Sequence, residues 1–82
     1  MTRNELIAEL QTLGIPSDSY CFDGLGAGEC YCAELVGTKW LCFYSERGQR
    51  QGVHYFDSEE EAYEYLLITL RRIFKKSLPS GS

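Results

Sequence analysis

The sequence predicts an α+β domain in which a four-stranded antiparallel meander sheet packs with two helices, in the order α-β-β-β-β-α. Segments with apolar residues at helical spacing lie near each end of the chain. Between them, short segments rich in aromatic residues alternate with glycine-containing turns, which is typical of strands. The 82 residues suffice for one domain, which we expect to span residues 1–76, with a disordered tail over residues 77–82.

The first helix is expected to begin after Thr2. Thr2 and Glu5 fit a capping box, in which each side chain satisfies a backbone N–H of the other residue. Gly14 stands where a left-handed C-terminal cap is expected, and Pro16 prevents the helix from continuing. The apolar stripe of this helix comprises Leu6, Ile7, Leu10 and Leu13.

Four strands are expected to follow, at about residues 19–23, 29–36, 39–45 and 53–56. The glycine-rich segment 24–28 lacks the spacing of a dinucleotide-binding fingerprint and is interpreted as a loop. Gly37-Thr38 suits a type II′ turn, which would place Tyr31 opposite Tyr44 and Cys32 opposite Phe43. Residues 46–52 are expected to form a polar turn before the last strand.

The last helix is expected to begin after a cap at Asp57 or Ser58, and Ser58 forms a second capping box with Glu61. Its glutamate-rich first turn suits the positive end of the helix dipole. A wide apolar arc predicts that this helix contacts both the sheet and the first helix, so that both helices cover one sheet face. The arc comprises Ala62, Tyr63, Leu66, Leu67, Leu70, Ile73 and Phe74.

The charge of the chain favours some partners over others. The formal net charge is −4 and the pI is near 4.8. Nucleic acid would be repelled, whereas a basic protein would be attracted. No secretory signal or apolar run long enough to span a membrane is seen, so we expect a cytoplasmic protein with reduced cysteines.

The cysteines are interpreted as structural, with no metal site and no cofactor. The predicted hairpin register places Cys42 on one sheet face and both Cys30 and Cys32 on the other, so the four thiols, Cys21 included, cannot converge on one ion. Cys30 and Cys32 are also too far apart along a strand to pair easily in a disulfide. The alternatives of a zinc protein and a thiol protein have less support from this spacing.

The sequence does not predict an enzyme. Its single histidine, His54, would approach Cys30 or Cys32 only if their sheet faces matched. No third group is placed to orient such a Cys–His dyad.

The hairpin face that carries Cys32, Leu41 and Phe43 is more apolar than a solvated face should be. If both helices cover the other face, this one is expected to be an exposed interaction surface. The alternatives are one helix on each face, or shielding by long side chains. The turn at Glu46 and Arg47 adds residue types that are common at interfaces.

Two segments carry a resemblance to a known family. They are the strand and turn of residues 39–48, KWLCFYSERG, and the helix entry of residues 56–62, FDSEEEA. Together with the chain size, they resemble the small acidic immunity proteins that accompany bacterial polymorphic toxins, including those of contact-dependent growth inhibition. The resemblance covers about residues 30–70. It implies a cytoplasmic protein that binds and blocks one cognate toxin domain, for which a basic nuclease is a suitable class.

We therefore expect a non-catalytic antitoxin that acts by protein–protein interaction. A self-associating module, which would form a homodimer through the exposed sheet face, is the alternative. The expected partner-binding residues are Leu41, Phe43, Glu46, Arg47, Glu59, Glu60 and Glu64.

Overall fold

The elements follow the predicted order. The structure is a computed structural model that describes residues 1–22 and 28–77. Most of the expected glycine loop and all of the expected tail beyond Ser77 lie outside the described residues. The elements are α1 (Arg3–Thr12), the 3-10 turn η1 (Ser17–Ser19), β1 (Tyr20–Cys21), β2 (Cys30–Val36), β3 (Lys39–Glu46), β4 (Gln49–Phe56) and α2 (Glu59–Ser77).

Helix α1 has the predicted caps at both ends. The hydroxyl of Thr2 accepts the Glu5 N–H at 3.2 Å, and the Glu5 carboxylate accepts the Thr2 N–H at 2.7 Å. At the other end, Gly14 has a φ of 77°. The Ile15 N–H donates to the Leu10 carbonyl, which completes a Schellman motif and buries Ile15 against the core.

The sheet has the strand order β1-β2-β3-β4, but it is not a pure meander. Strand β1 pairs with β2 in parallel, with Tyr20 beside Tyr31 and Cys21 beside Cys32. The prediction of an all-antiparallel sheet is therefore wrong at this edge. Parallel pairing needs a return connection, and a strand of only two residues shortens the distance that this connection must span.

The β2–β3 hairpin has the predicted register at every pair from Cys30–Ser45 to Val36–Lys39. Gly37 has a φ of 66°. Thr38 does not have a positive φ. This combination, with a positive φ at the first central residue only, is the one that a type II′ turn requires.

The next turn differs from the expectation. Arg47 and Gly48 both have positive φ, at 51° and 76°, and form a tight two-residue connection of the type I′ pattern. Strand β4 therefore begins at Gln49 rather than at residue 53.

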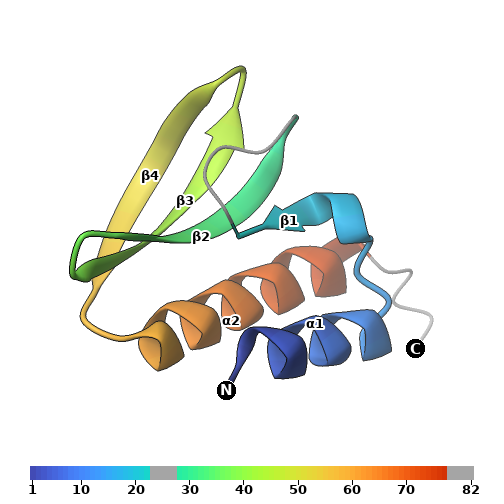
Figure 1. Ribbon diagram of the computed structural model, residues 1–82. Helices are drawn as coiled ribbons and strands as arrows, with labels where there is room; N and C mark the ends of the chain where they lie inside the picture. The colour runs from blue at the N-terminus through green and yellow to red at the C-terminus, as the bar shows by residue number, and fades with distance from the viewer. Residues whose placement is uncertain (23–27, 78–82) are drawn as a thin grey trace.

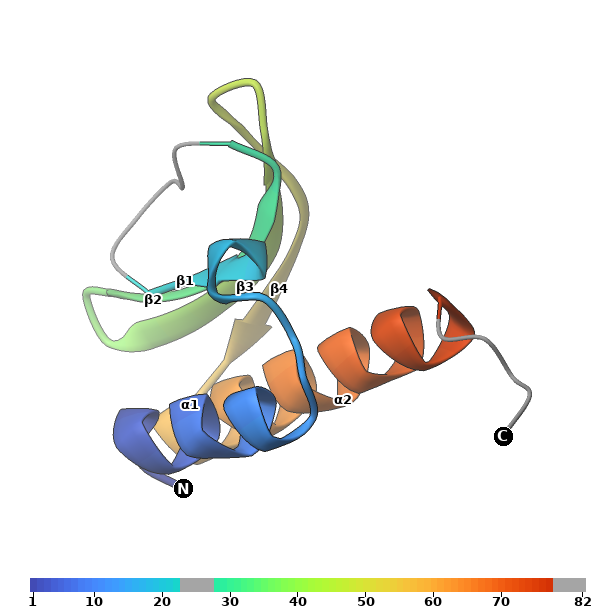
Figure 2. The ribbon, with the colours of Figure 1, turned by 90° about the vertical axis from the view of Figure 1, so that its right-hand side faces the viewer.

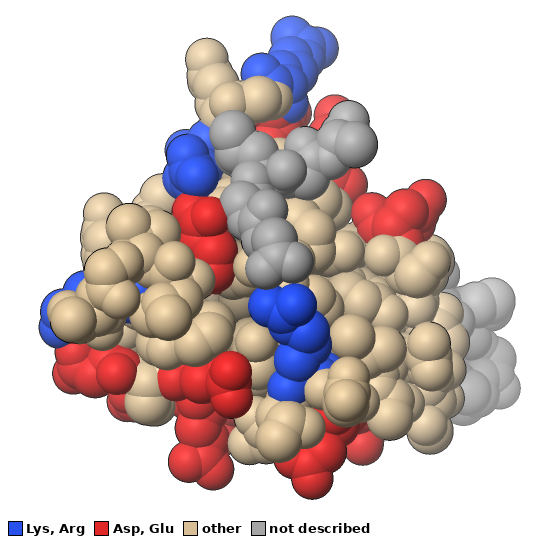
Figure 3. All heavy atoms as spheres, viewed as in Figure 1, with Lys and Arg blue, Asp and Glu red and all other residues tan. Residues whose placement is uncertain are grey.

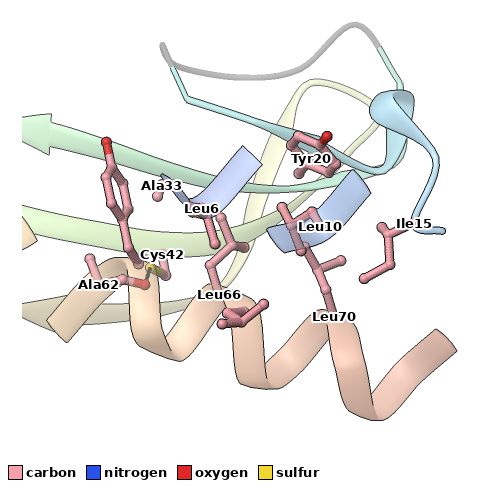
Figure 4. Packing of buried hydrophobic residues seen from close by; sticks show 11 residues of the cluster. Leu6, Leu10, Ile15, Tyr20, Ala33, Cys42, Ala62, Leu66 and Leu70 are labelled. Carbon is pink, nitrogen blue, oxygen red and sulfur yellow. Dashed lines mark hydrogen bonds between the residues drawn. The ribbon is translucent and has the colours of Figure 1, made fainter. Parts of the chain in front are cut away.

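Both helices cover the same sheet face, as predicted. Helix α2 runs beneath the sheet and α1 lies alongside α2 (Figures 1 and 2). Figure 4 shows Leu6 and Leu10 from α1 meeting Leu66 and Leu70 from α2, beneath Ala33 of β2. No helix within the described residues is both long enough and apolar enough to cross a membrane.

The opposite sheet face has a core of its own, made of Cys30, Cys32, Leu41 and Phe43. Leu41 is 9% exposed and Phe43 is 3% exposed, so the expected exposed apolar surface is not present at these residues. The guanidinium of Arg50 lies 5.1 Å from the centre of the Phe43 ring. This side chain helps to shield the face, which is one of the alternatives that the sequence left open.

Candidate functional site

A cleft of about 330 Å³ opens between the sheet and the middle of α2. Strands β3 and β4 form one wall and α2 forms the other, with Tyr31 of β2 also contributing. The cleft is lined by Tyr31, Cys42, Phe43, Tyr44, Gln51, Gly52, His54, Tyr65, Leu66 and Thr69. A concave site with several aromatic side chains and a few polar groups is the usual form of a recognition site.

Two ring pairs shape the cleft. Tyr31 and Tyr44, which are opposite each other in the β2–β3 register, have ring centres 4.8 Å apart. His54 of β4 and Tyr65 of α2 have ring centres 4.9 Å apart. The cleft therefore offers flat aromatic surfaces from three strands and one helix.

Carboxylates border the tyrosines. The Tyr44 hydroxyl donates a hydrogen bond to the Glu29 carboxylate at 3.1 Å. The pKa of Tyr44 is raised by desolvation, by this hydrogen bond, and by the negative charges of Glu29 and Glu46. An aromatic site with a negative border is complementary to a cationic group of a partner.

Cys42 and His54 meet in the cleft, although the sequence placed no dyad there. They are opposite each other in the β3–β4 register and so share the helix-facing side of the sheet. The dyad of His54 with Cys30 or Cys32 is not formed, because those cysteines belong to the other face. Burial raises the pKa of Cys42 to about 12, and its thiol lies 3.2 Å from the Ala62 carbonyl, which can accept its hydrogen bond. Cys42 is therefore protonated at neutral pH and is a poor nucleophile.

The predicted partner-binding residues fall into three groups. Leu41 and Phe43 are buried in the second core. Glu46 and Arg47 lie at the β3–β4 turn, and Arg47 is exposed there. Glu59, Glu60 and Glu64 are exposed on the first turns of α2, where Glu60 also lies 3.8 Å from the N-terminal amine.

The two exposed groups do not form one site. The β3–β4 turn points away from the helices, whereas the start of α2 lies at the opposite end of the molecule (Figure 1). In Figure 3, acidic side chains gather along the helical edge, while basic and acidic side chains are mixed at the end that carries the turn. The structure thus separates charges that the sequence had grouped as one set of contacts.

The cleft itself was missed by sequence reasoning. The predicted register already paired Tyr31 with Tyr44, which is a partial signal. No local pattern gives the distance between a sheet and a helix, so the approach of Tyr65 to His54 of β4 could not be read from the chain.

Three cysteines converge on the face away from the helices. We call Cys21, Cys30 and Cys32 the three-thiol cluster, because their sulfur atoms all lie within 4.8 Å of one another. Cys21 and Cys32 form a disulfide, so the expectation that every cysteine is reduced is wrong in this structure. The argument that the cysteines cannot converge holds for Cys42 but not for these three.

No protein-family model, curated protein or solved structure matches this chain significantly.

Proposed function

We propose that this chain is a non-catalytic binding protein that recognises and neutralises one cognate bacterial toxin domain. The observation that carries the proposal is the aromatic cleft, which has a negative border at Glu29 and Glu46. Tyrosine-rich concave surfaces are frequent centres of protein interfaces, since tyrosine buries a large area and keeps a polar hydroxyl. The resemblance of residues 39–48 and 56–62 to immunity proteins supplies the class of partner.

Charge supports a basic partner such as a nuclease domain. The chain carries a formal charge of −4, and four exposed glutamates lie in the first two turns of α2. These groups would steer a basic domain toward the molecule, while the cleft would hold a side chain of that domain.

Self-association has less support than binding to a different protein. It depended on an exposed apolar sheet face, and Leu41 and Phe43 are buried in the second core. A partner that meets the cleft needs no such exposed face.

The test begins with the gene neighbourhood. A secreted-toxin gene next to this one would identify the candidate partner, whose C-terminal domain can be produced with and without this chain. We expect the purified domain and the chain to form a stable complex, and co-expression to restore the growth of bacteria that produce the domain. A chain that neither binds the adjacent toxin nor protects cells from it would refute the proposal.

A matched pair of variants locates the contact. His54→Ala removes an exposed ring from the cleft and should weaken binding by about tenfold or more. Tyr55→Ala changes the next residue, which is 67% exposed and lies opposite Leu41 on the far face. It should leave the affinity unchanged. Equal effects of the two variants would place the interface elsewhere.

A further inference from the structure

The topology of the sheet assembles the three-thiol cluster. Cys21 is beside Cys32 because β1 pairs with β2 in parallel, with their Cα atoms 4.7 Å apart. Cys30 and Cys32 are two residues apart on β2, so their side chains point to the same face. Cys30 is 5% exposed and Cys32 is fully buried, while Cys21 is half-buried.

The spacing of the sulfur atoms suits a single metal ion. Cys30 Sγ lies 3.2 Å from Cys21 Sγ and 3.7 Å from Cys32 Sγ. Thiolates bound to one ion at about 2.3 Å have sulfur atoms roughly 3.8–4.0 Å apart. The disulfide now joins two of the three ligands, so reduction is required before an ion can enter. Rotation of the Cys21 and Cys32 side chains would then move their sulfur atoms apart to the distance that a shared ion requires.

A second observation, independent of the cysteines, also points to a ligand. Ser45 is fully buried, and its hydroxyl has no hydrogen-bond partner among the described residues. Ser45 is directly opposite Cys30 in the β2–β3 register, so the hydroxyl is on the same face as the cluster. Buried hydroxyls are rarely left unpaired, and a metal-bound thiolate would give this one an acceptor.

We propose that the reduced three-thiol cluster binds one thiophilic metal ion, Zn²⁺ or Cu⁺, through Cys21, Cys30 and Cys32, with Ser45 as a positioning residue. A phosphine or dithiol reductant supplies the two electrons that cleave the disulfide, and each sulfur takes up one proton. Metal binding then releases the protons of the thiols that become ligands. The inference does not depend on the proposed role in toxin neutralisation.

Thiol protection tests the ligand set in the wild-type chain. The chain is reduced with a phosphine, freed of reductant without oxygen, and loaded with one equivalent of Zn²⁺ or of Cu⁺ in separate samples. Native mass spectrometry should show one ion per chain with at least one of the two metals. Alkylation and peptide mapping should then show slower modification of Cys21, Cys30 and Cys32, with no change at Cys42. No stoichiometric binding of either metal, or equal protection of all four cysteines, would overturn the proposal.

Variants separate ligands from bystanders. Cys30→Ser should abolish one-to-one binding at equimolar metal, while Cys42→Ser should bind as the wild type does. Ser45→Ala should weaken binding by about tenfold, as expected for loss of a group that orients a ligand. Circular dichroism shows whether each variant is folded. If Cys30→Ser does not fold, the thiol-protection experiment on the wild-type chain tests the ligand set instead. Wild-type affinity in a folded Cys30→Ser variant would refute the assignment.

Discussion

Arg50 shows how one long side chain can help to close an apolar sheet face. Its guanidinium stacks over the Phe43 ring and donates hydrogen bonds to one Glu34 carboxylate oxygen at 2.9 Å and 3.1 Å. The ion pair holds the guanidinium over the ring, where cation–π attraction adds to simple shielding. A face that is apolar in sequence thus becomes part of the interior without a third helix.

Phe43 is consequently a stability residue rather than an exposed contact. Phe43→Ala should lower the free energy of unfolding by about 3–5 kcal/mol, because a buried ring is lost and a cavity remains. Urea unfolding measures this change. Tyr55→Ala on the neighbouring strand is the control and should change stability by less than about 0.5 kcal/mol. A fully stable Phe43→Ala protein would show that the ring is not packed in solution.

Cys42 should make the free energy of unfolding depend on pH in the alkaline range. Its pKa rises from 9.0 in the unfolded reference to about 12 in the fold, so only the unfolded chain loses this proton between those values. The folded state then binds more protons, and this contribution to stability decreases as pH increases, by at most about 1.4 kcal/mol per pH unit. Urea unfolding of wild type and Cys42→Ala from pH 8 upward isolates the contribution. Parallel pH profiles of the two proteins would contradict the assignment.

Ser45 should be a site where truncation stabilises the metal-free chain. Its buried hydroxyl has no partner among the described residues, and Ser45→Ala removes that desolvation cost. We expect the free energy of unfolding, measured by heat or urea, to increase by about 1 kcal/mol. A loss of stability would mean that the hydroxyl has a partner in solution.

At the scale of the element, the β3–β4 hairpin depends on a few positive φ angles. The type I′ pattern at Arg47 and Gly48 makes the turn tight, and Gly52 has a φ of 61° beside the register shift opposite Cys42 and Tyr44. Such a bulge increases twist along an edge strand and makes pairing with another chain harder.

Gly52→Ala tests the bulge. A Cβ at this position meets no atom within 4 Å, so the cost is the positive φ alone, about 1–2 kcal/mol. Gln51→Ala is the matched neighbour, is exposed, and should cost less than about 0.5 kcal/mol. Equal stability of Gly52→Ala and wild type in urea would show that β4 does not keep this bulge.

At the scale of the whole molecule, charge is distributed unevenly. Acidic side chains gather along the helical edge, where α2 begins with Glu59, Glu60 and Glu61, while both signs of charge are mixed at the end that carries the β3–β4 turn (Figure 3). The helical edge therefore carries a concentration of negative charge, and a basic partner would be oriented by it as it approaches.

The charge distribution predicts a kinetic effect on the proposed complex. Glu59→Gln combined with Glu64→Gln should lower the association rate constant about 2–5-fold at low salt and make it less sensitive to salt. The dissociation rate should be unchanged, because both side chains are exposed. Stopped-flow mixing with the toxin domain measures both rates. A change confined to dissociation would instead place these glutamates in the contact itself.

The features that depend on neighbouring residues can be read from the chain. The caps of α1, the β2–β3 register and the apolar arc of α2 follow from local hydrogen bonding and periodicity. At the start of α2, the Ser58 hydroxyl accepts a hydrogen bond from the Glu61 N–H, as predicted. The Glu61 carboxylate accepts a hydrogen bond from the same hydroxyl, whereas the predicted capping box has it accept from the Ser58 backbone N–H. Local patterns thus give the elements and the faces of the hairpin.

The features that bring distant residues together depend on how the elements pack. The parallel pairing of β1 places Cys21 beside Cys32, and the packing of α2 on β4 creates the aromatic cleft. The stacking of Arg50 on Phe43 buries the face that the sequence left exposed. The first two depend on the direction and distance at which two elements meet, and the third selects one of the alternatives that the sequence left open for this face. Periodicity within one segment carries no information about either quantity.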